Sequence, residues 1–189
     1  MKKLNRYTIY LLVVISASLA SCGTQRVSTI VGCEYDVKKN QTDYIVFPYG
    51  KASIPGRWVK THYYSVNTQQ FFTNTDKTVN IAIAFQRFDS YEFNQDGSKK
   101  GFDFVNAYYE WDSKYFMEKF GCNRNVIESD SLRNYIIYRI FNSNEVDTYF
   151  LIGEKNGNIS NFSIHNTDEW NVKEKIEFIK MLFIESIEE

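Results

Sequence analysis

Alternating apolar and polar positions recur along this 189-residue chain and predict short β-strands. The clearest case is residues 78–88, where Val79, Ile81, Ile83 and Phe85 alternate with smaller or polar residues. Successive side chains on a strand point to opposite faces, so these four would share one face. Weaker alternation and short apolar runs predict seven more strands, at residues 44–47, 57–63, 69–73, 125–128, 134–142, 148–154 and 158–165.

Asn156-Gly157 lies between the last two of these segments and predicts a tight hairpin turn. Both central residues of such a turn need a positive φ, which asparagine and glycine tolerate best.

Helical periodicity predicts a first helix over residues 102–120. Phe104, Tyr108, Trp111 and Tyr115 are spaced four, three and four residues apart, which places them on one apolar stripe. Gly121 follows at the position where a left-handed residue commonly ends a helix.

A second helix closes the sequence. We expect it to begin near Asn166, Thr167 or Asp168, because each of these side chains is suited to cap a helix. Its apolar stripe comprises Val172, Ile176, Ile179, Phe183 and Ile187.

This order of elements predicts the α+β class, an antiparallel sheet with two main helices packed on it. The helices have two possible arrangements, on the same face or on opposite faces of the sheet. Both faces of the predicted strands are apolar, which favours opposite faces.

The first residues carry a different pattern. Three basic residues precede an uncharged apolar run at positions 7–20, which ends in Leu19-Ala20-Ser21-Cys22. The run is too short for a bilayer span of about 20 residues and is typical of a secretory signal. Its ending resembles the lipobox of bacterial lipoproteins. That resemblance implies cleavage before Cys22 and a diacylglyceryl group on its thiol; the alternative is an ordinary signal peptide or membrane anchor with a chance cysteine.

Three segments follow from this interpretation: a signal peptide at 1–21, a lipidated tether at 22–39 and a single α+β domain at 40–189. We expect the protein in the cell envelope, anchored to a bacterial membrane by its lipid, with the outer membrane favoured and the leaflet left open.

Removal of Lys2, Lys3 and Arg6 with the signal changes the formal net charge from −1 to −4. A mildly acidic domain with dispersed basic residues argues against nucleic acid as a partner.

Lipidation of Cys22 would leave Cys33 and Cys122 as one pair in an oxidising compartment. A disulfide between them is one hypothesis, and two separate thiols are the other.

Candidate catalytic residues are few. His62 and His165 are the only histidines, they lie far apart in the sequence, and we interpret His165 as a surface residue. Asp112 and Glu110 are interpreted as charged surface. The sequence contains no metal-ligand spacing, nucleophile elbow or phosphate loop. We therefore expect no enzyme activity, no metal and no cofactor.

Aromatic pairs offer a candidate contact surface. Most are expected in the core, but Tyr63, Tyr64 and Tyr109 are candidates for an exposed patch that contacts a partner.

Element order and a few residues resemble the PsbP-like fold, an α/β/α sandwich shared by photosystem accessory proteins and DcrB-type bacterial lipoproteins. The matching pieces are Ile54-Pro55-Gly56-Arg57-Trp58, the helix at 102–120, the Asn156-Gly157 hairpin and the closing helix. The resemblance covers about residues 44–187 and implies an accessory role without a uniform activity.

Two functions are expected from these patterns. The first is a membrane-anchored accessory or binding subunit that contacts another envelope protein. The alternative is a glycan- or ligand-binding lipoprotein that uses exposed aromatic residues. A flat aromatic patch favours the first, and aromatic residues at a groove favour the second.

Overall fold

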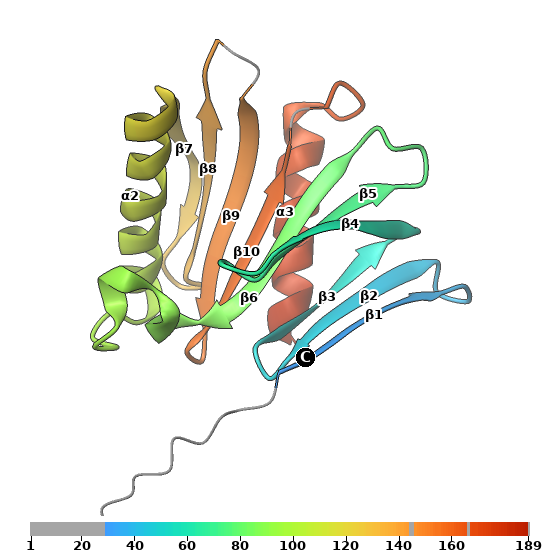
Figure 1. Ribbon diagram of the computed structural model, residues 1–189, viewed down its shortest axis with the longest axis horizontal. Helices are drawn as coiled ribbons and strands as arrows, with labels where there is room; N and C mark the ends of the chain where they lie inside the picture. The colour runs from blue at the N-terminus through green and yellow to red at the C-terminus, as the bar shows by residue number, and fades with distance from the viewer. Residues whose placement is uncertain (1–28, 144–145, 166, 189) are drawn as a thin grey trace, which may run out of the picture.

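The computed structural model describes residues 29–143, 146–165 and 167–188. Seven antiparallel strands form the main sheet, in the order β4-β5-β6-β10-β9-β8-β7 (Figure 1). Their bounds are β4 Trp58–Tyr64, β5 Gln69–Asn74, β6 Asn80–Arg87, β7 Asn123–Asp130, β8 Tyr135–Phe141, β9 Asp147–Lys155 and β10 Asn158–Ile164. All eight strands expected from the sequence are therefore present, seven of them in this sheet.

The eighth belongs to a smaller antiparallel sheet of β1 (Ile30–Asp36), β2 (Gln41–Phe47) and β3 (Gly50–Pro55). This sheet corrects the predicted tether, because residues 30–36 are paired along their whole length with β2. The inner residues of β2 and β3 join the core of the main sheet. The folded domain thus includes β1 and does not begin at residue 40.

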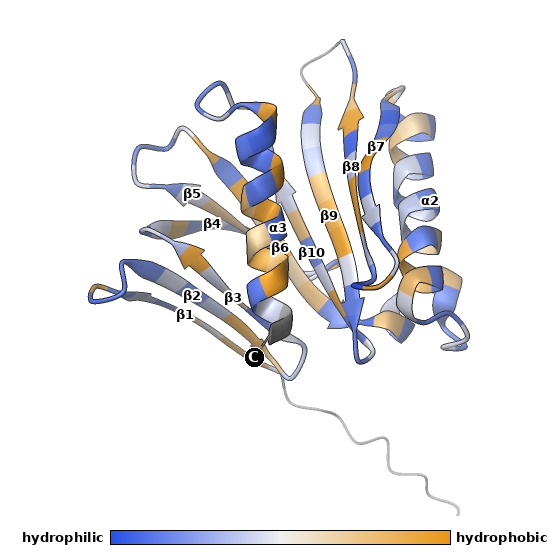
Figure 2. Ribbon diagram, turned by 180° about the vertical axis from the view of Figure 1, so that it is seen from behind, coloured by the Kyte–Doolittle hydropathy of each residue, from blue (hydrophilic) through white to orange (hydrophobic). Residues whose placement is uncertain are grey.

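Two helices, α2 (Gly101–Phe120) and α3 (Val172–Glu188), cover opposite faces of the main sheet (Figures 1 and 2). Alternate residues of β8 belong to two cores: Ile137 lies in the core that includes Phe183 of α3, and Ile136 lies in the core that includes Phe104 of α2. Both faces of the strand are apolar because both are covered. The α+β class and the opposite placement of the helices are confirmed. None of the helices within the described residues is long and apolar enough to cross a membrane.

Asn156 and Gly157 form the predicted hairpin turn between β9 and β10, with φ values of 54° and 82°. Gly121 ends α2 in the left-handed conformation, with φ 61°, and its amide donates to the carbonyl of Met117. Two short 3₁₀ segments, η1 (Phe88–Ser90) and η2 (Glu92–Asn94), lead from β6 into α2.

The second helix begins later than expected. Its capping residue is Asn171: the Asn171 side chain accepts from the Glu174 amide at 3.1 Å, and Glu174 accepts from the Asn171 amide at 2.7 Å. Such a reciprocal pair satisfies two amides that a helix start leaves free. Thr167 instead donates its hydroxyl to the carbonyl of Thr78, and Asn166 lies outside the described residues.

Candidate functional site

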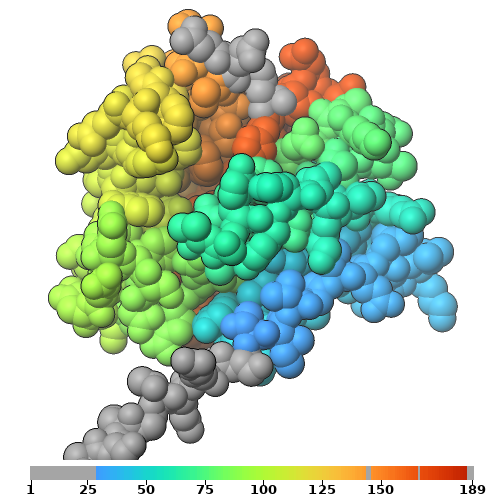
Figure 3. All heavy atoms as spheres, viewed as in Figure 1, coloured from blue at the N-terminus to red at the C-terminus, as the bar shows by residue number. Residues whose placement is uncertain are grey.

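A groove lies between α2 and the turn that joins β4 to β5. We call it the α2–β4 groove; its lining residues are Tyr64, Val66 and Asn67 on the strand side and Trp111, Asp112, Tyr115 and Phe116 on the helix side. Its volume is about 340 Å³, near the lower end of the range for small-molecule sites. Figure 3 shows the hollow between the yellow atoms of α2 and the teal atoms of β4, with the orange atoms of the strands behind recessed.

Helical periodicity explains the helix wall. Positions 111, 112, 115 and 116 are spaced by one turn, so their side chains fall on one stripe of α2. Trp111 is held in place because its indole nitrogen donates to Glu92 at 2.6 Å and its ring packs 5.6 Å from Phe93. The wall is therefore anchored to the 3₁₀ segment that precedes the helix.

The strand wall depends on the end of β4. Tyr64 is 53% exposed, and its ring lies 4.4 Å from His62 and 5.5 Å from Phe71. These edge-to-face contacts hold the tyrosine ring beside the groove.

Asp112 is the charged residue in the helix wall. It is half-buried, and its Oδ2 atom accepts a 2.6 Å hydrogen bond from the Tyr138 hydroxyl on β8. Burial raises the pKa of Asp112 to about 6, while the Tyr138 hydrogen bond opposes that rise. Within the described residues no Lys, Arg or His pairs with this carboxylate. The sequence interpretation of Asp112 as surface charge is therefore wrong.

Strand β10 and the residue that follows it, His165, place three polar side chains on the face of the sheet that α2 covers. Asn161 donates to the Tyr108 hydroxyl at 2.6 Å, but its Oδ1, the Ser163 hydroxyl and Nε2 of His165 are buried without a hydrogen-bond partner among the described residues. Burial lowers the pKa of His165. His165 is thus no surface histidine; its ring lies 5.4 Å from Phe71.

The three tyrosines of the predicted contact surface do not form one patch. Tyr63 is 46% exposed and lines a separate cavity beside Tyr44, while Tyr64 lines the α2–β4 groove. Adjacent strand residues point to opposite faces, which explains the separation. Tyr109 is only 8% exposed because it packs 5.1 Å from Tyr138. Its prediction as an exposed residue is wrong.

The two downstream cysteines also lie apart. Cys33 packs against the core on the α3 side of the main sheet, and Cys122 is buried in the core on the α2 side. Both are free thiols. The structure therefore contradicts the disulfide hypothesis, because the main sheet separates the two side chains. Cys22 lies outside the described residues.

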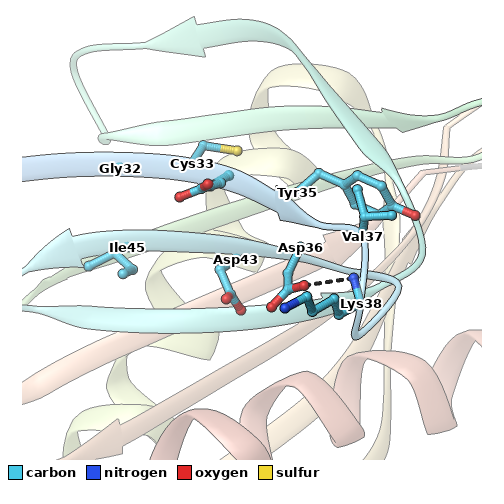
Figure 4. A pocket seen from close by; sticks show the side chains of 9 residues that line it. Gly32, Cys33, Tyr35, Asp36, Val37, Lys38, Asp43 and Ile45 are labelled. Carbon is cyan, nitrogen blue, oxygen red and sulfur yellow. Dashed lines mark hydrogen bonds between the residues drawn. The ribbon is translucent and has the colours of Figure 1, made fainter.

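A second, polar hollow lies along β1 and β2, and Figure 4 shows its residues. The Asp36 carboxylate accepts from the Lys38 amide at 2.8 Å there, and Asp43 accepts from Ser53 at 2.8 Å. These local bonds occupy the carboxylates of Asp36 and Asp43. Among the described residues no group of three His, Cys, Asp or Glu side chains is placed to hold a metal ion.

Most of the groove has no signal in the sequence. Helical periodicity predicts Trp111 and Tyr115 on one apolar stripe, yet Tyr115 is exposed and both residues line the groove. Their helical spacing was the available signal. The opposite wall, more than 40 residues away in the sequence, left no local signal.

Comparisons with known proteins identify no family for this chain. No family model matches the sequence, and no curated protein matches it. The chain is similar to the solution structure of cyanobacterial PsbP (CyanoP) from Synechocystis sp. PCC 6803, at 13% sequence identity and a TM-score of 0.42, with 88% of this chain and 94% of that chain covered.

Proposed function

We propose that this protein is a lipid-anchored binding protein of the bacterial cell envelope whose domain holds a small ligand in the α2–β4 groove. The anchor is proposed from Leu19-Ala20-Ser21-Cys22 and the basic and apolar residues before it. An outer-membrane location is proposed on the same ground.

The observation that carries the binding proposal is the aromatic wall of the groove. Tyr64 and Tyr115 are about half exposed and face a common space with Trp111. Aromatic rings supply large contact area with little loss of side-chain freedom and stack on sugar or other ring-shaped ligands. This concave arrangement favours ligand binding over contact with a flat protein surface.

Titration calorimetry of the full chain in detergent micelles with the N-acetylglucosamine trimer tests this proposal. We expect saturable binding that weakens at least fivefold in Tyr64→Ala and in Tyr115→Ala. Both side chains are half exposed, so their removal leaves the core intact. Phe47→Ala is the matched control, because Phe47 is 59% exposed on the smaller sheet, outside the groove. Absence of binding, or equal weakening in all three variants, would contradict a glycan-binding groove.

An accessory role in an envelope assembly is the second candidate, and edge strand β1 supports it. β1 pairs only with β2 among the described strands, and Ile30 and Val31 are exposed on it. An unpaired strand edge is a template for a strand of another protein. A photo-crosslinking residue at Glu34 should capture one specific envelope protein under this hypothesis, and no specific product would contradict it. Absence of enzyme activity stays a prediction.

A further inference from the structure

Asp112 is a half-buried carboxylate that pairs with no cation among the described residues. Asp147 pairs with Arg139 at 2.6 Å, and Glu128 pairs with Lys180. Asp112 has only the hydroxyl of Tyr138 as a hydrogen-bond partner among the described residues. A neutral hydroxyl leaves the negative charge of a carboxylate uncompensated, and burial of such a charge is costly.

The surroundings of Asp112 are aromatic. Trp111, Tyr115, Phe116 and Tyr64 line the same groove. The face of an aromatic ring carries partial negative charge and attracts cations, and rings around a quaternary ammonium group form a recurrent recognition site. The aromatic rings and the carboxylate therefore both favour a ligand with a positive charge.

We propose that the α2–β4 groove binds an alkylammonium group, with Asp112 as its counter-ion and the four aromatic rings packed around the alkyl carbons. This inference rests on the proposed function and names the chemical class of its ligand. Sugar rings that carry a free amine and choline-like head groups share this chemistry. The carboxylate contributes charge and selectivity, and the rings contribute contact area.

Ionisation of Asp112 is a requirement of this site. Among the described residues, three buried phenols interact with its charge: Tyr138 on β8, Tyr108 on α2 and Tyr91 between η1 and η2. Burial and the Asp112 charge hold the pKa of each phenol above its usual range, so all three stay neutral near pH 7. Asp112, with a pKa of about 6, is thus the group whose charge changes, and alkylammonium binding should weaken below pH 6.

Choline and 3,3-dimethylbutan-1-ol separate charge from shape, because the second compound replaces the quaternary nitrogen of choline by carbon. Calorimetric titration of the full chain in detergent micelles should show choline binding at least tenfold tighter than the neutral alcohol at pH 7.5. Asp112→Asn should abolish that preference, since the amide keeps an acceptor for Tyr138 but carries no charge. Glu118→Gln is the matched control, an exposed carboxylate further along α2, and should keep the preference.

Equal affinity for choline and the alcohol, no binding of choline, or a preference that survives in Asp112→Asn would each overturn the inference. Thermal melting confirms that the variants are folded. The N-acetylglucosamine trimer provides the separate test of the groove: Tyr64-dependent binding of the trimer without a choline preference leaves the proposed function standing and removes only its ammonium specificity. Failure of both probes contradicts both proposals.

Discussion

The hydroxyl of Tyr138, on β8, donates a 2.6 Å hydrogen bond to Oδ2 of Asp112, on α2. Asp112 also lines the α2–β4 groove. The Asp112 carboxylate therefore helps to hold α2 on the main sheet and also lines the candidate site. Stability and binding should consequently both respond to its protonation.

Stability should fall as the pH rises through the titration of Asp112. Its folded pKa of about 6 lies above the ordinary 3.8, so between these values the folded state binds more protons than the unfolded state. The free energy of unfolding therefore decreases as the pH rises between these two pKa values. The total decrease, reached above pH 6, is up to about 3 kcal/mol. Asp112→Asn should be more stable than the parent by about 1–3 kcal/mol at pH 7.5, and the difference should shrink towards pH 4. Urea denaturation at both pH values measures this; a pH-independent difference would contradict it.

Tyr138→Phe should lower the free energy of unfolding at pH 7.5 by about 1.5–3 kcal/mol, because it removes a hydrogen bond to a charged group. The same change should raise the pKa of Asp112 further. Tyr35→Phe is the control: it removes an exposed 2.8 Å hydrogen bond to Asn40 and should cost less than about 0.5 kcal/mol. Equal costs for the two variants, measured by urea denaturation, would argue against a buried charged pair.

Gly153→Ala tests the packing of α3 on the main sheet. A Cβ atom at Gly153, on β9, would lie 2.2 Å from Cε2 of Phe183, whose ring is fully buried. Such overpacking costs about 1–3 kcal/mol. Gly32→Ala, where a Cβ meets nothing within 4 Å, should change stability by less than about 0.5 kcal/mol. If thermal melts show equal effects at both positions, this packing is wrong.

Thiol titration tests the separation of Cys33 and Cys122. The unfolded, unreduced protein should show both thiols as reactive. In the folded state Cys33 should react faster, because Cys122 is the more deeply buried; burial also raises the pKa of the Cys33 thiol and slows its reaction relative to a free cysteine. Mass spectrometry after alkylation identifies each site. A linked Cys33–Cys122 peptide would restore the disulfide hypothesis.

Cys22→Ser should abolish incorporation of a labelled fatty acid and release the protein from membranes. The lipobox resemblance motivates this prediction, and fractionation of labelled bacteria measures both effects. Label that persists in Cys22→Ser would place the lipid elsewhere.

The fold was predictable from the sequence where a regular alternation of apolar and polar residues dominates a segment. Val79, Ile81, Ile83 and Phe85 alternate along β6, and all four are buried. The sequence does not predict strands β1 and β3, because each carries a glycine and neither shows a sustained alternation of buried and exposed residues comparable to that of β6. Their pairing with β2, together with burial of Ala52 and Ile54 against the core, stabilises them, and neither contribution is visible within a short window of sequence.

The groove was less predictable because topology creates it. Tyr64 and Asp112 become neighbours only when α2 and the β4–β5 turn meet over the same sheet. Composition indicated exposed aromatic residues, but only the fold separates Tyr64, which is exposed, from Tyr109, which is buried. Asp112 follows the same helical stripe as its aromatic neighbours, and its burial depends on Tyr138 of β8.

Fluorine NMR of the full chain labelled with 5-fluorotryptophan tests the central claim most directly. The chain has three tryptophans: Trp111 lines the groove, while Trp58 and Trp170 pack together on the α3 side with ring centroids 6.4 Å apart. Choline and the N-acetylglucosamine trimer, added separately, should move the Trp111 signal with at least one of them and leave the other two signals unchanged. A Trp111 signal that responds to neither compound, or a shift confined to Trp58 or Trp170, would contradict ligand binding in the α2–β4 groove.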